Sequence, residues 1–202
     1  MATRTITRLY DTQDEAAKAV RALEAAGVPH ADISVVGSGH DGASEGADNT
    51  AADANSGTGI GATLGTLVGG GAGLLAGIGA LAIPGIGPVV AAGWLVAALT
   101  GAGVGAAAGG LLGSLTGAGV SEEDAHVYAE GVRRGGAVLS ARVDEAEAAR
   151  LESVLAGSGG HVDVAARRAE YQAEGWNRFD PAAPAYTASD VRAERKRRVR
   201  VS

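Results

Sequence analysis

The residues best suited to catalysis or ligand binding are few and widely spaced in this chain. The histidines are His30, His40, His126 and His161. No two of them have the spacing of metal ligands, and His126 stands between Glu122 and Glu130 at i−4 and i+4, which is typical of a solvated helix face. Residues 37–42, GSGHDG, match a dinucleotide-binding pattern after an expected strand, but no helix is expected to open there. We therefore predict a protein that is not an enzyme, with no catalytic residue, no metal site and no cofactor.

The charge pattern offers a different kind of chemistry at the C-terminal end. The chain of 202 residues has a net charge of −6, yet residues 192–200 contain six cations and one acid. This basic tip is predicted to contact an anion or an anionic lipid surface. Its candidate residues are Arg195, Lys196, Arg197, Arg198 and Arg200. Because the rest of the chain is acidic, no nucleic-acid partner is expected.

Two stretches have the patterns of an α/β domain. Residues 1–37 predict a strand, a helix and a second strand, with Thr12 and Glu15 spaced as a capping box at the helix start. Residues 121–168 predict a helix capped by Ser121, and then strand, helix and strand, the last strand being HVDVAAR. Together they predict an α+β fold with the ferredoxin-like, split β-α-β order.

Three further segments separate or follow these halves. Residues 38–56 are polar and acidic and predict a flexible linker. Residues 57–118 lie in a stretch without charge that interrupts the domain. Residues 169–202 form a polar tail in which little independent fold is expected, although its aromatic side chains could dock on the domain or on a partner. These aromatic residues are Tyr171, Trp176, Phe179 and Tyr186.

Glycine recurs at every fourth position from Gly57 to Gly77, and again from Gly93 to Gly117 with Ala97 in one place. A helix with glycine at this spacing has a bare ridge against which a second helix can pack closely. We therefore predict a glycine-zipper helical hairpin over 57–118, with the chain reversing at Pro84 and Pro88. The predicted helix-packing residues are Gly57, Gly61, Gly65, Gly69, Gly73, Gly77, Gly93, Gly101, Gly105, Gly109, Gly113 and Gly117.

The hairpin predicts association with a membrane or with other copies of the chain. A helix from Gly59 to Ala82 would be about 36 Å long, enough for a hydrocarbon core of about 30 Å, and Trp94 would lie near the turn, as interfacial aromatic residues do. A ridge of period four also drifts around the helix, so one partner cannot cover it and a homo-oligomer is expected. A hairpin buried in a water-soluble oligomer and a flexible glycine linker are the alternatives.

Two stretches of sequence resemble a known family. SEEDAHVYAEGVRRGGAVLSARVD, residues 121–144, and LYDTQDEAAKAVRALEAAGV, residues 9–28, resemble the bacterial general stress proteins with a YflT-like heat-induced stress protein domain. The resemblance implies a stress-linked protein without enzymatic activity and supplies no catalytic residues. If the family has a site, its residues here would be Tyr128, Arg133 and Arg134.

The expected function is therefore structural. We predict a stress-associated protein that assembles with itself or attaches to the inner membrane through the hairpin. No secretory signal precedes the first strand, so the expected location is the cytoplasm or the cytoplasmic membrane, with both folded halves on the cytoplasmic side. The alternative is a soluble ferredoxin-like module that senses a ligand or regulates a partner.

Overall fold

The computed structural model describes residues 2–42, 79–83, 85–95 and 110–199. In this part of the chain six strands form one sheet, in the order β3-β4-β2-β5-β1-β6. The strands are β1 (Thr3–Tyr10), β2 (Ile33–Ser38), β3 (Gly79–Ile83), β4 (Gly87–Ala92), β5 (Ala137–Asp144) and β6 (His161–Val162). The helices are α1 (Gln13–Ala25), α4 (Gly110–Gly117), α5 (Glu122–Arg133), α6 (Glu145–Ser158), α7 (Val164–Ala173) and α8 (Ala188–Val199). Short 3-10 turns are η1 (His30–Asp32) and η2 (Gly39–Gly42).

Two β-α-β units interlock at the centre of the sheet. β5 pairs antiparallel with both β1 and β2, and β1 pairs antiparallel with β6. Each of α1 and α6 therefore joins two strands that flank a strand of the other unit. The α+β class predicted from the sequence is confirmed, and the N-terminal and C-terminal halves form a single sheet.

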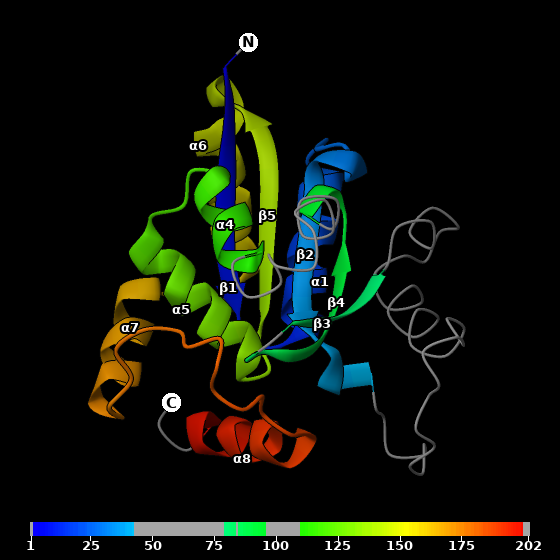
Figure 1. Cartoon of the computed structure of the whole chain (residues 1–202). Coiled ribbons are helices and arrows are strands. Elements are labelled where there is room, and N and C mark those ends of the chain that lie inside the picture. Colours follow the sequence, from blue (N-terminus) through cyan, green and yellow to red (C-terminus); the bar gives the residue numbers. More distant parts are fainter. Residues whose placement is uncertain (1, 43–78, 84, 96–109, 200–202) are drawn as a thin grey trace.

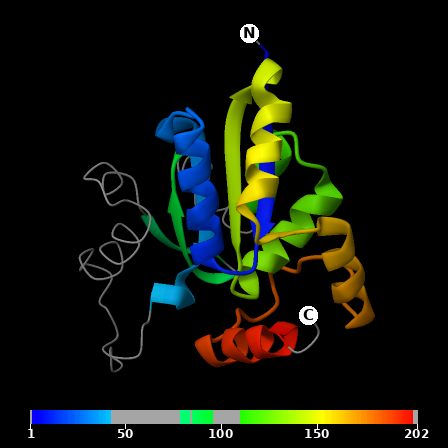
Figure 2. The ribbon, with the colours of Figure 1, turned by 180° about the vertical axis from the view of Figure 1, so that it is seen from behind.

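Helices cover both faces of this sheet. α1 and α6 lie side by side on one face (Figure 2), and α4 and α5 lie on the other (Figure 1). Alternation along the strands supplies both cores: Ile6 and Tyr10 of β1 pack towards α1 and α6, whereas Leu9 packs with Ala125 and Ala129 of α5.

The predicted helix starts in the two halves are confirmed. The Thr12 hydroxyl accepts a hydrogen bond from Glu15 N at 3.2 Å, and Thr12 N donates to the Glu15 carboxylate at 3.1 Å, so the capping box is complete. Ser121 caps α5 in the same manner, accepting from Asp124 N at 3.1 Å.

The prediction for HVDVAAR was wrong after its second residue. β6 ends at Val162, and the Asp163 carboxylate accepts a hydrogen bond from Ala166 N at 2.8 Å, which starts α7. An aspartate at this position satisfies a free N–H of the first helical turn, and the alanines and arginines that follow favour a helix.

The tail, in which little independent fold was expected, contains two helices. α7 and α8 are helical, and α8 lies across one end of the sheet (Figures 1 and 2). Tyr171 and Phe179 are fully buried in the domain, so the expected docking of tail aromatics is confirmed for these two.

The predicted helical hairpin is wrong over residues 79–92. β3 and β4 form an antiparallel β-hairpin that pairs with β2 and extends the sheet. Gly85 and Gly87 have φ of +76° and +95°, which breaks any helix and closes the hairpin turn instead. Trp94 follows this hairpin, and the guanidinium of Arg142 lies 5.0 Å from its ring centroid.

Three of the predicted helix-packing glycines lie in the described residues. Gly93 has φ of +89° and lies in the bend after β4, whereas Gly113 and Gly117 belong to α4, where an added Cβ atom would meet nothing within 4 Å among the described residues. Within this part of the chain, none of the three packs against a second helix as a glycine zipper requires. The other predicted positions fall outside the described residues, as does most of the expected linker. These positions are Gly57, Gly61, Gly65, Gly69, Gly73, Gly77, Gly101, Gly105 and Gly109.

No helix among the described residues is long and apolar enough to cross a membrane.

Candidate functional site

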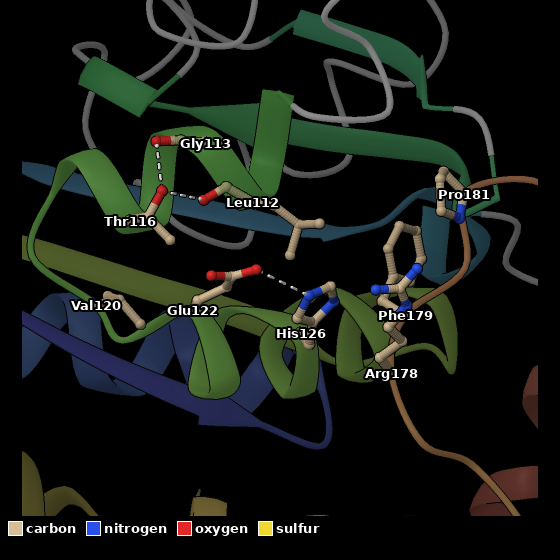
Figure 3. A pocket seen from close by; sticks show the side chains of 9 residues that line it. All are labelled: Leu112, Gly113, Thr116, Val120, Glu122, His126, Arg178, Phe179 and Pro181. Carbon is tan, nitrogen blue, oxygen red and sulfur yellow. Dashed lines mark hydrogen bonds and ion pairs between the residues drawn. The ribbon is translucent and has the colours of Figure 1, made fainter.

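A cleft of about 600 Å³ lies between α4, α5 and the segment that joins α7 to α8 (Figure 3). This volume is within the range of small-molecule sites. Its lining residues are Leu112, Gly113, Thr116, Val120, Glu122, His126, Arg178, Phe179 and Pro181.

Each wall of the cleft is fixed by packing on the sheet. Leu111 and Leu115 anchor α4, and Ala125 and Ala129 anchor α5, in one hydrophobic cluster. The third wall is held by Phe179, which is 2% exposed and belongs to the same cluster. The cleft is therefore bounded by elements packed on the sheet, and it combines apolar side chains such as Leu112 and Val120 with polar ones.

Three charged or ionisable side chains border the cleft. His126 Nε2 lies 4.0 Å from the Glu122 carboxylate, and its Nδ1 is buried without a hydrogen-bond partner in the described part of the chain. Arg178 is exposed, and Glu122 points largely into solvent. The Thr116 hydroxyl donates to the carbonyls of Leu112 and Gly113, at 3.0 and 3.2 Å, so its proton is already engaged (Figure 3). This arrangement suits the binding of a small molecule with an apolar body and a polar group.

A cluster of paired arginines and carboxylates lies where the tail meets the domain. We call it the arginine–carboxylate cluster; it consists of Asp11, Glu130, Arg134, Arg167, Glu174, Glu194 and Arg198. Arg134 is at its centre, with Nε donating to Glu130 at 2.8 Å and Nη1 to Glu194 at 3.2 Å. The buried guanidinium donates hydrogen bonds to several carboxylates, which is the condition for burying a charge.

The residues implied by the family resemblance all make contacts within the domain. Tyr128 OH donates to the Thr7 carbonyl at 3.3 Å, and burial raises the pKa of Tyr128 to about 12. Arg133 donates to Glu130 and to the Pro184 carbonyl, both at 3.1 Å, and lies 4.9 Å from the ring centroid of Tyr186. Arg134 joins the cluster described above.

The structure brings part of the predicted basic tip to the same place. Arg198 pairs with Asp11 and Glu194, Arg197 with Glu174 and Glu194, and Arg195 donates to the Gly135 carbonyl at 2.8 Å. Lys196 is exposed on α8, and Arg200 falls outside the described residues.

The acidic partners in the cluster were not identified from the sequence, and one was misread. Glu130 was predicted to lie on a solvated face, yet it is 1% exposed. The signal was available, because Arg133 and Arg134 follow it at i+3 and i+4. Glu194 offered the same signal, with Arg197 and Arg198 at i+3 and i+4, whereas Asp11 and Glu174 gave none because their partners are far away in the sequence.

The cluster predicts a fall in stability in acid. Burial disfavours the charged form of Asp11, but its hydrogen bonds and attraction to Arg167 and Arg198 outweigh this and lower its pKa below 3.8. Burial also disfavours the charged form of Glu174. The hydrogen bond and charge of Arg134 outweigh this effect and lower the pKa of Glu174 below 4.5. A carboxyl group with a lowered folded-state pKa stabilises the fold above its ordinary pKa, and this contribution is lost as the pH falls through the folded value.

We therefore expect the free energy of unfolding, measured with urea at a series of pH values, to fall as the pH drops below about 4.5. In the Asp11→Asn variant, the free energy of unfolding should decrease less steeply with falling pH than in the parent chain. An equal slope in the variant and the parent chain would show that Asp11 does not contribute through its charge.

Within the described residues, no group of three or more His, Cys, Asp or Glu side chains is arranged to hold a metal ion.

One comparison with known proteins gave a match. Residues 5–73 match the model of a family described as the heat induced stress protein YflT domain. The match contains α1 and β2 and starts within β1, so it supports the resemblance seen in residues 9–28; residues 121–144 lie beyond it. Searches of curated proteins and of solved structures found no similar protein.

Proposed function

From the heat induced stress protein YflT domain that this chain carries over residues 5–73, we propose a stress-associated protein that is not an enzyme and acts by assembly. In this proposal the uncharged glycine-rich segment associates with other copies of the chain or attaches to the inner membrane. Both folded halves then remain on the cytoplasmic side.

The completeness of the sheet supports a separate role for the glycine-rich residues. β1 and β5 form eight residue pairs, from Thr3 with Asp144 to Tyr10 with Ala137, and α1 packs beside α6. We describe β2, β5, β1 and β6 with α1 and α6 as a ferredoxin-like arrangement that β3, β4 and α4 extend. Residues 57–78 and 96–109 supply none of these four strands, and in this proposal they are the residues that carry the assembly.

The test is to fill the glycine ridge with side chains. In the ladder variant, three of the predicted helix-packing glycines, Gly65, Gly69 and Gly105, are replaced together by Leu. The control variant replaces three glycines outside that set by Leu, namely Gly59, Gly71 and Gly103. Light scattering measures the particle mass, and carbonate-washed membrane fractions measure attachment.

We expect the parent chain and the control variant to assemble or to pellet with membranes, and the ladder variant to do neither. Circular dichroism should show that all three keep the folded domain. The proposal would be contradicted if the parent chain were monomeric by light scattering and absent from the carbonate-washed membranes. It would also be contradicted if the two variants had the same particle mass and the same membrane attachment.

The cleft in Figure 3 favours ligand binding as a second candidate function. Its apolar walls and the exposed Arg178 suit an aromatic anion, for which anilinonaphthalene sulfonate is a fluorescent probe. We expect Arg178→Gln to weaken binding of this probe and the control Lys18→Gln, at an exposed position of α1 on the other face of the sheet, to leave it unchanged. Equal binding to both variants would eliminate the cleft as an anion site.

A further inference from the structure

α8 docks on the domain with little apolar contact. Of its side chains described at 188–198, only Val191 and Glu194 are buried. Val191 packs directly over Gly135, where an added Cβ atom would lie 2.3 Å from Val191 Cγ1. One apolar contact is a small anchor for a helix of 12 residues, so charge must supply much of the attachment.

The attachment is made by arginines of α8 and carboxylates of the domain. Arg198 pairs with Asp11, and Arg197 Nη1 lies 3.1 Å from the Glu174 carboxylate. In the other direction, Glu194 of α8 accepts from Arg134 at 3.2 Å. Asp11 and Glu174 are about one-third exposed, so salt and competing anions can reach these pairs.

The outer side of α8 is also basic. Arg192 and Lys196 are exposed, and the paired Arg197 is 60% exposed. An anionic surface would therefore meet cations on α8 before any pair is broken. The anionic headgroups of a surface bound at α8 can accept hydrogen bonds from its arginines, as the carboxylates of Asp11 and Glu174 do.

We propose that α8 is an exchangeable element: docked, its arginines bind carboxylates of the domain, and released, they bind an anionic lipid surface. A lipid surface is favoured over nucleic acid because residues 54–78 and 96–109, outside the described domain, contain no charged residue, a composition that suits an apolar phase. The exchange itself is argued from the contacts of α8, and only the choice of lipid draws on these uncharged residues.

Exchange has a consequence that simple adsorption lacks. If docking and lipid binding compete for the same arginines, a change that weakens docking must strengthen lipid binding. Asp11→Asn removes a partner of Arg198, whereas Asp14→Asn removes the same charge from an exposed position three residues along the chain.

The experiment measures binding of the full chain to phosphatidylcholine vesicles with and without phosphatidylglycerol. We expect Asp11→Asn to bind the anionic vesicles about fivefold more tightly than Asp14→Asn, the effect of losing one partly buried ion pair. High salt should release both variants. Binding to pure phosphatidylcholine would report the glycine-rich segment, so the two proposals can fail separately.

Hydrogen exchange on the bound parent chain provides a second measurement. Amides in residues 134–136 and 188–198 should lose protection on anionic vesicles while β1 and β5 keep theirs. Should Asp11→Asn fail to fold, Glu174→Gln replaces it, with exposed Glu147→Gln as control.

Three outcomes would overturn the proposal. The first is equal vesicle binding by the two matched variants, and the second is unchanged protection of α8 on the vesicles. The third is equally tight binding of a single-stranded oligonucleotide, which would replace lipid as the partner.

Discussion

Glu130→Ala is expected to lower the free energy of unfolding by about 3–5 kcal/mol, because it leaves a buried guanidinium without its main acceptor. Glu130 is 1% exposed and accepts from Arg134 Nε at 2.8 Å and from Arg133 Nη1 at 3.1 Å. Both arginines are themselves largely buried, so water cannot take the place of the lost carboxylate. Urea unfolding near neutral pH gives the measurement.

Glu147→Ala is the matched control for this substitution. Glu147 also lies on a helix and pairs with an arginine three residues later, but both side chains are about half exposed. An exposed pair of this kind contributes about 0.3–0.5 kcal/mol. Equal losses for Glu130→Ala and Glu147→Ala would mean that the Glu130 carboxylate does not stabilise the buried arginines.

Gly93→Ala should cost about 3 kcal/mol, from overpacking and a strained backbone together. Its φ of +89° is disfavoured for alanine, and an added Cβ would lie 2.2 Å from the Ile33 carbonyl oxygen. This turn is also held by Ser34, which donates to the Ala92 carbonyl at 2.7 Å and accepts from Leu95 N at 3.2 Å. The backbone therefore has no room to move away from the new methyl group.

Gly113→Ala separates this explanation from the glycine zipper. Gly113 lies inside α4, and no described residue comes within 4 Å of an added Cβ, so alanine should stabilise the helix by up to about 1 kcal/mol. A zipper would make both glycines contact residues and both substitutions harmful. Thermal unfolding of the two variants decides between these patterns, and a loss at Gly113 as large as that at Gly93 would favour the zipper.

The elements that the sequence predicted correctly are those whose signals are local. The Thr12–Glu15 capping box marks the start of α1, and Ser121 marks the start of α5. In β5, alternate residues such as Leu139 and Ala141 face one core while Val138 faces the other, a period that is visible in the sequence.

α8 was missed because its cause is not local. It is very hydrophilic, with Val191 as its buried apolar side chain among residues 188–198, so its sequence is like that of a solvated tail. Its docking depends on Asp11, which lies 187 residues from Arg198 in the chain. No pattern within a short window can indicate such a pair.

The strands β3 and β4 were missed for a different reason. GALAI and GPVVAA are short, apolar and rich in small residues, and such runs fit a strand or a buried helix equally well. The glycine spacing favoured a helix, but Gly85 and Gly87 are required for their positive φ in the turn. The cleft beside α4 could not be predicted at all, because its third wall comes from the tail.

The position of β1 sets an order of events during synthesis. β1 is made long before β5 and β6, the strands with which it pairs in the described part of the chain, and the hydrogen-bonded Thr7 and Ser140 are 133 residues apart. A nascent chain therefore leaves the ribosome with β1 and the apolar face of α1 uncovered until β5 has emerged. Closing the long intervening loop adds little entropy cost per added residue, but it delays native pairing until most of the polypeptide exists. During translation this protein is thus expected to depend on chaperones, even though its finished sheet is covered on both faces.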